Sequence, residues 1–185
     1  MQHARAQSVV ERTLLSLTDQ QLHTRPYEGA NSIAWIVWHM TRIEDLIAPI
    51  VVGEPQLLTE PAWAARLGVE ARDVGTGMTD ADIEAFNVQV NLACLREYYR
   101  GVGARTEEYA KRLRPEELDE VPDALRLPAM LQELGALGPN AAWVGEEFLA
   151  GMSKATVLSH LGYGHKQAHW GEAITLRGIM GVPGR

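Results

Sequence analysis

Cysteine is almost absent from this sequence: Cys94 is the only one among 185 residues. A single cysteine cannot form an internal disulfide, so the fold depends on none, as is typical of proteins from a reducing compartment. The first residues, MQHARAQSVVERTLL, lack the continuous apolar run of a signal peptide. No stretch reaches the roughly 18 consecutive apolar residues that indicate a membrane span. We therefore expect a cytoplasmic protein without a membrane partner.

Basic residues are also scarce, with 17 lysines and arginines against 24 acidic residues and a formal net charge of −7. A nucleic-acid-binding protein needs a basic face to neutralise phosphates, so we expect no nucleic-acid partner. Hydrophobic residues make up 46% of the chain, a share typical of globular proteins and too high for a disordered chain. The length suits a single domain over residues 1–185.

The alternation of apolar and polar residues that marks β-strands is nearly absent. Apolar residues instead recur every three or four positions, which is the spacing of helices. The first predicted helix ends near LTDQQ, and the others occupy residues 33–53, 80–114 and 154–181. The third can be one long helix or two abutting ones, with a bend at Gly101 and Gly103. Gly181 and Pro183 are expected to end the last helix.

Capping residues support these helix starts. Asn31 or Ser32 is expected to cap the second helix, Thr79 with Asp82 the third, and Ser153 the last. Residues 54–78 read as an irregular connection, and residues 115–152 contain three short candidate helices. Four helices with two long connections predict an all-α fold, a four-helix bundle with crossover connections.

The last predicted helix contains GHKQAHWGE, with two histidines four residues apart. At 100° per residue, its leucines mark an inward-facing stripe whose middle is polar. Two imidazoles one turn apart have Cβ atoms roughly 6 Å apart and can bind one metal ion. A zinc-protease motif is excluded, because Lys166 stands where that motif requires glutamate. The stripe comprises Leu158, Leu161, His165, His169, Glu172 and Leu176.

A third metal ligand is available in the second helix, where His39 lies on or near the core side, one turn after Trp35. If the two helices pack together, three imidazoles can share one ion and leave a position open for water or substrate. Trp35 and Trp170 can wall a pocket there. His3, His23 and His160 are expected at the surface or in loops, since His160 lies about 140° around the helix from His165. Cys94 is expected to be a small buried residue.

Two segments, NSIAWIVWHMTRIED and LSHLGYGHKQAHWGEAITLRG, resemble the DinB/YfiT-like superfamily of metal-binding four-helix bundles. The resemblance implies that His39, His165 and His169 bind a divalent metal, often zinc or nickel. It also implies a homodimer and a small-molecule substrate. Some members resembling this sequence are transferases or isomerases that use bacillithiol, mycothiol or a glutathione-like thiol. Glu172 stands where the family more often has glutamine.

Several functions remain open at this point. Glu172 can hold a histidine in one tautomer, act as a fourth ligand, or serve as a general base. The first functional hypothesis is a metal-dependent enzyme that activates water or a low-molecular-weight thiol for attack on a small electrophile, hence a hydrolase or an S-transferase. The second is a non-catalytic, stress-response bundle that binds a metal or small ligand. The third is a metal-free helical interaction domain.

Overall fold

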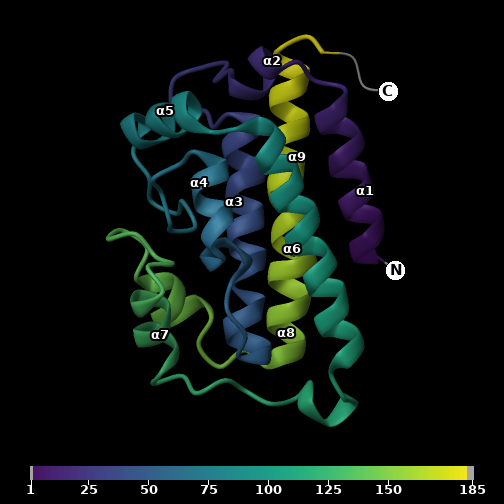
Figure 1. Ribbon diagram of the computed structural model, residues 1–185, viewed down its shortest axis with the longest axis vertical. Helices are drawn as coiled ribbons and strands as arrows, with labels where there is room; N and C mark the ends of the chain where they lie inside the picture. Colours follow the sequence, from purple (N-terminus) through teal and green to yellow (C-terminus); the bar gives the residue numbers. More distant parts are fainter. Residues whose placement is uncertain (1, 183–185) are drawn as a thin grey trace.

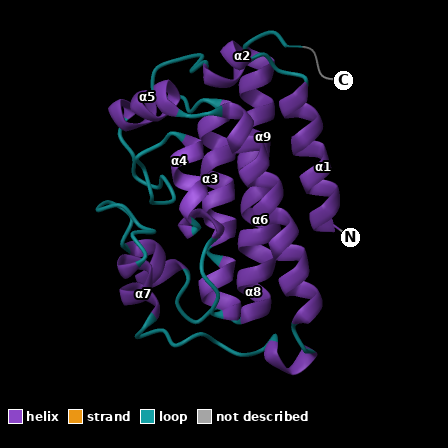
Figure 2. Ribbon diagram, viewed as in Figure 1, coloured by secondary structure: helices purple, strands orange, loops and turns teal. Residues whose placement is uncertain are grey.

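The computed structural model describes residues 2–182, which form helices and loops without a strand (Figure 2). Four helices run along the longest axis (Figure 1): α1 (Gln2–Leu15), α3 (Ile33–Asp45), α6 (Leu92–Arg112) and α9 (His165–Ile179). Helix α3 contacts both α6 and α9, and α1 contacts the same two helices. The all-α prediction is confirmed. The described residues contain nine α-helices, so the predicted count of four is not confirmed.

The shorter elements connect and cover these helices. Figure 1 shows α4, α5 and α7 on the same side of the long helices. None of the helices in the described part of the chain is both long and apolar enough to cross a bilayer. The remaining elements are α2 (Asp19–His23), α4 (Pro61–Leu67), α5 (Asp80–Gln89), α7 (Leu127–Glu133) and α8 (Lys154–Ser159), with the short turns η1 (Ala48–Val52), η2 (Leu57–Thr59), η3 (Pro115–Glu117), η4 (Val144–Phe148) and η5 (His160–Gly164).

The predicted capping residues begin three helices. The Ser32 side chain accepts a hydrogen bond from the Trp35 N–H at the start of α3, and Thr79 forms a reciprocal capping box with Asp82 at the start of α5. Ser153 caps α8 in the same way. These hydrogen bonds satisfy N–H groups that have no partner within the helix, which explains why local sequence located these starts correctly.

Other boundaries differ from the prediction. The helix expected over residues 33–53 leaves α-geometry after Asp45 and ends in the π-helical turn η1, where Gly53 adopts φ 71°. The segment 80–114 is two helices, and Asn91 caps the second. The connection 54–78 contains the unpredicted helix α4, which starts at a proline. The last segment consists of α8, η5 and α9; Pro183, expected to stop it, lies outside the described residues.

Helix α3 is buried along its whole length, including its charged side chains. Buried charges are costly unless they are paired or hydrogen-bonded. Arg42 donates a hydrogen bond to the Arg72 carbonyl (2.6 Å), and Asp45 accepts one from the Leu57 N–H (2.9 Å). Two charged residues of α3 therefore hold the connection between α3 and α5 in place. This connection includes Val74, whose carbonyl contacts His39.

A second buried cluster joins α1, α3 and α9. Lys166 is 1% exposed and pairs with the fully buried Glu44. Lys166 also donates to Gln7 Oε1 (2.9 Å), and His3 Nε2 lies 2.6 Å from Glu44 Oε1. His3 was expected at the surface or in a loop; that prediction is wrong, because the start of α1 lies against Glu44 of α3 and Lys166 of α9. This cluster fixes how α9 sits beside α3.

Candidate metal centre

The last helical segment reaches the site through a π-helical turn. Residues His160–Gly164 form η5, and the backbone N–H of His165 bonds to the carbonyl of His160, five residues back. A π-turn holds more residues than an α-turn, so it moves residue i+5 close to residue i. The His160 ring centroid consequently lies 6.4 Å from that of His165. The prediction that His160 lies away from the site is wrong, because it assumed an unbroken α-helix.

His39 is held from two sides. Its side chain is 95% buried in α3, and Nδ1 donates a hydrogen bond to the Val74 carbonyl at 2.5 Å. A carbonyl only accepts, so Nδ1 carries the proton and Nε2 keeps its lone pair. The Trp35 ring stacks on the imidazole, with centroids 4.9 Å apart and an interplanar angle of 6°. A Cβ added to Gly75 would lie 3.1 Å from Trp35 Cζ2, so the backbone at Gly75 passes close to the Trp35 ring.

His169 is oriented by a similar contact. Its Nδ1 lies 2.9 Å from Glu172 Oε2, and Glu172 Oε1 accepts a hydrogen bond from Asn31 Nδ2 at 2.8 Å. Since a carboxylate accepts, Nδ1 is the protonated nitrogen and Nε2 is left to bind a ligand. Asn31 precedes the cap of α3, so this chain of hydrogen bonds also links the start of α3 to α9. Of the three roles open to Glu172, this contact favours holding a histidine tautomer.

The three histidines meet. The ring centroids of His39 lie 4.9 Å from His165 and 4.6 Å from His169, and those of His165 and His169 lie 4.6 Å apart. One potential ligand nitrogen from each lies within 4.8 Å of the other two. The predicted convergence of the second and last helices is therefore present, and one ion can be shared by the three imidazoles.

His165 adds an observation that fits a bound ion. Its Nδ1 is buried and has no hydrogen-bond partner in the described part of the chain. A buried polar nitrogen without a partner costs free energy, and most such groups in proteins are satisfied. One potential ligand nitrogen of His39 and one of His169 lie within 4.8 Å of each other and of one from His165. A cation bound between the three rings would give these nitrogens a partner.

Burial also sets the protonation of the cluster. Burial is the largest effect on His39 and lowers its pKa to about 4, with the Val74 carbonyl opposing. Burial, followed by repulsion from the neighbouring histidines, lowers the pKa of His165 to about 2. Both rings are neutral near pH 7, which is the form that binds metals. The hydrogen bond from His169 lowers the pKa of Glu172, so this carboxylate is ionised.

The remaining predicted residues lie elsewhere. Trp170 is 6% exposed and belongs to the apolar core. His23 ends α2 and is half-buried. Cys94 is half-buried rather than fully buried. Only Trp35 of the two predicted tryptophans contacts the histidine cluster among the ring contacts of the described residues.

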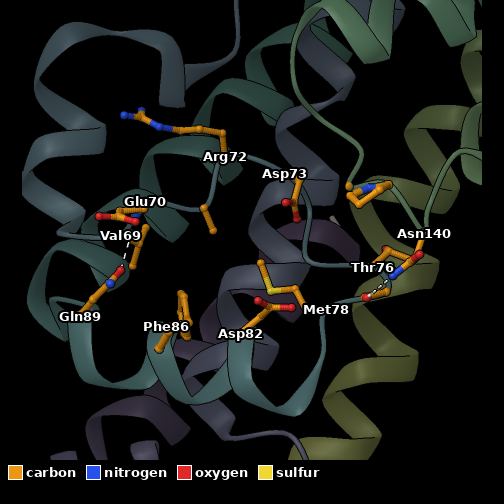
Figure 3. A pocket seen from close by; sticks show the side chains of 15 residues that line it. Val69, Glu70, Arg72, Asp73, Thr76, Met78, Asp82, Phe86, Gln89 and Asn140 are labelled. Atoms are coloured by element: carbon orange, nitrogen blue, oxygen red, sulfur yellow. Dashed lines mark hydrogen bonds between the residues drawn. The ribbon is translucent and has the colours of Figure 1, made fainter.

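A separate cavity of about 500 Å³ lies beside the segment whose Val74 carbonyl accepts a hydrogen bond from His39. Figure 3 shows Asp73, Met78 and Asn140 among the side chains around it. Asp73 lines this cavity, whereas the next residue, Val74, bonds to His39. None of the three clustered histidines lines the cavity. It shares a wall with the candidate metal centre but is not part of it.

The comparisons with known proteins agree with the fold. The family model of the DinB superfamily matches residues 2–173, a range that includes the three histidines and Glu172. A conserved protein from Enterococcus faecalis, known from a crystal structure, is similar with a TM-score of 0.71. The alignment covers 97% of this chain and 94% of that chain at 21% identity, so it shows the fold alone. No curated protein sequence matches.

Proposed function

Because the chain belongs to the DinB superfamily, we propose that it is a metal-dependent enzyme in which His39, His165 and His169 hold one divalent ion, zinc or nickel. The observation that carries this proposal is the convergence of three imidazoles from two helices, with ligand nitrogens within 4.8 Å of one another. Side chains on packed helices are rigid, and rigid imidazoles suit a metal site.

The residues around the ligands fit this role. The Val74 carbonyl and Glu172 keep the Nδ1 protons of His39 and His169 in place, so both Nε2 atoms are ready to bind. Both oxygens of Glu172 already accept a hydrogen bond. We therefore assign Glu172 to positioning His169, and not to the general-base role that the sequence also left open.

When bound, a divalent ion acts as a Lewis acid that lowers the pKa of a bound water or thiol. The three histidines would hold the ion, which would support hydrolysis where water is the nucleophile and S-transfer where a thiol is. The cluster of potential ligands contains three residues and no fourth within the described chain. Catalytic zinc sites have three protein ligands, whereas structural sites have four. This count favours an enzyme over a non-catalytic binding bundle.

Three finer proposals accompany this function. We infer that α1, α3, α6 and α9 are the four helices of the expected bundle, since α1 and α3 each contact both α6 and α9. We also propose a cytoplasmic homodimer, with a low-molecular-weight thiol as a second cofactor. These proposals are supported by the family and by the sequence, and solution mass and thiol binding are the measurements that check them.

Metal analysis of the untagged protein tests the proposed function. We expect about one zinc or nickel ion per chain. His39→Ala and His169→Ala should lose the ion, whereas His23→Ala, outside the cluster, should keep it. A protein that is free of metal and does not bind added zinc by calorimetry would defeat the proposal. If metal is bound, the next assay compares p-nitrophenyl acetate hydrolysis with conjugation of glutathione or bacillithiol to 1-chloro-2,4-dinitrobenzene.

A further inference from the structure

An exposed group of aromatic rings lies beside the histidine cluster. We call Trp143, Phe148 and His160 the aromatic patch. Trp143 is 47% exposed and Phe148 is 36% exposed. Their ring centroids lie 6.2 Å apart in an edge-to-face contact, and Phe148 lies 5.0 Å from His160. Scattered exposed apolar residues are ordinary, but a contiguous group next to a reactive site indicates binding.

The segment that carries Trp143 and Phe148 is held in place by buried residues. Trp143 immediately precedes the π-helical turn η4 and Phe148 is its last residue. Val144 and Gly145 of this turn are buried, as is Leu149 just after it. A Cβ added to Gly145 would lie 3.1 Å from a Leu131 methyl group, so the turn packs closely on α7. The buried positions fix the turn, and the two large rings remain outside.

The aromatic patch continues into the candidate metal centre. His160 touches Phe148 on one side, and its ring lies 6.4 Å from that of His165 on the other. The π-turn η5 creates this continuity, because an α-helix would place His160 on a different face from His165. A row of rings therefore leads from the surface at Trp143 to the three clustered histidines.

We infer that the aromatic patch binds a planar aromatic or conjugated group of the substrate while the reacting end lies at the histidine cluster. This inference rests on the proposed function and adds a substrate class to it. Aromatic groups prefer edge-to-face or offset stacking at centroid distances of about 4.5–7 Å. Phe148 and Trp143 already contact neighbouring rings in this way and keep exposed surface for a further ring.

Two metal-binding probes of equal length test the inference. The zinc-loaded protein is titrated with 3-phenylpropionohydroxamate and with 3-cyclohexylpropionohydroxamate, which share the metal-binding head and differ only in the ring. We expect the phenyl probe to bind roughly three- to tenfold more tightly. Phe148→Leu and Trp143→Leu should reduce this preference to less than twofold, whereas Phe148→Tyr should keep it. Acetohydroxamate, which lacks a ring, should bind all variants equally.

The outcomes separate this inference from the proposed function. If zinc does not bind, both fail. If zinc and acetohydroxamate bind but the wild type shows no preference for the phenyl probe, the inference alone is overturned. Light scattering is measured in parallel, because exposed rings can also pack against a second copy of the chain. Loss of a dimer in Trp143→Leu with an unchanged phenyl preference would assign the patch to a subunit contact and overturn the inference.

Discussion

Replacing Lys166 with methionine should destabilise the protein strongly. Lys166 and its partner Glu44 are 1% and 0% exposed, so the substitution leaves a carboxylate in the core without its main counter-charge. Breaking a buried pair by removing one partner costs about 3–5 kcal/mol. For a chain of this size, each kcal/mol lowers Tm by about 2–4 °C, so we expect a drop of about 6–20 °C.

Two control variants separate the buried charge from the loss of a lysine. The double variant Glu44→Leu/Lys166→Met replaces both charges by apolar groups and should lie within about 1 kcal/mol of the wild type, or above it. Lys154→Met removes the surface pair with Glu120 (2.8 Å) and should cost less than about 1 kcal/mol. Urea unfolding followed by circular dichroism measures all three.

The pH dependence gives a further check. Burial alone raises the pKa of Glu44, but the charge of Lys166 and the contacts with His3 outweigh it, so the pKa lies below its usual value. A depressed carboxyl pKa stabilises the fold above about pH 4.5 and this contribution is lost as the pH falls through the folded pKa. Without Lys166, the effect of burial dominates, so the pKa of Glu44 should rise above its usual value and its ionised form should destabilise the fold. The cost of Lys166→Met should therefore shrink between pH 8 and pH 4.5; an equal cost at both would refute the reasoning.

Three further predictions concern the site and the backbone. Glu172→Ala should weaken zinc binding by about 10–100-fold in a chelator competition, and Glu172→Gln, which keeps an acceptor oxygen, should weaken it less. The pKa is about 4 for His39 and about 2 for His165, so the unfolded chain binds more protons than the folded chain below about pH 6.5. The free energy of unfolding of the metal-free protein, measured in urea, should therefore fall as the pH drops below that value. His39→Gln should show a smaller fall. Gly68→Ala should cost about 1–3 kcal/mol, because Gly68 has φ +72° and its added Cβ would lie 2.8 Å from a backbone oxygen; Gly29→Ala, with nothing within 4 Å, should cost less by the same assay.

Local chemistry explains which parts of the fold were predictable. Ser32, Thr79 and Ser153 cap helices through hydrogen bonds within three residues, so their role is visible in sequence. The pair His165 and His169 was also accessible, because helix geometry places residues four apart on one face. Their meeting with His39 depends on how two distant helices pack; the core-side position of His39 made it a candidate, and the family resemblance supported the choice.

The features missed have no local signature. A π-turn adds a residue to one turn, and an analysis that assumes 3.6 residues per turn places His160 on the wrong face. The partner of His39 Nδ1 is a backbone carbonyl, Val74, which any residue type can supply. The pairing of Glu44 with Lys166 joins residues far apart in the sequence, and neither is distinguished by its neighbours.

Two polar sites lie between α3 and α9, the Glu44–Lys166 ion pair and the histidine cluster, and they have different roles. His165 and Lys166 are adjacent, so their side chains leave α9 about 100° apart. One faces His39, and the other reaches Glu44 near α1. Because the ion pair already fixes α9 against α3, the histidines can be brought together before an ion binds. We therefore expect the fold to form without the metal, and substitution of the clustered histidines should remove metal binding while the helices stay assembled.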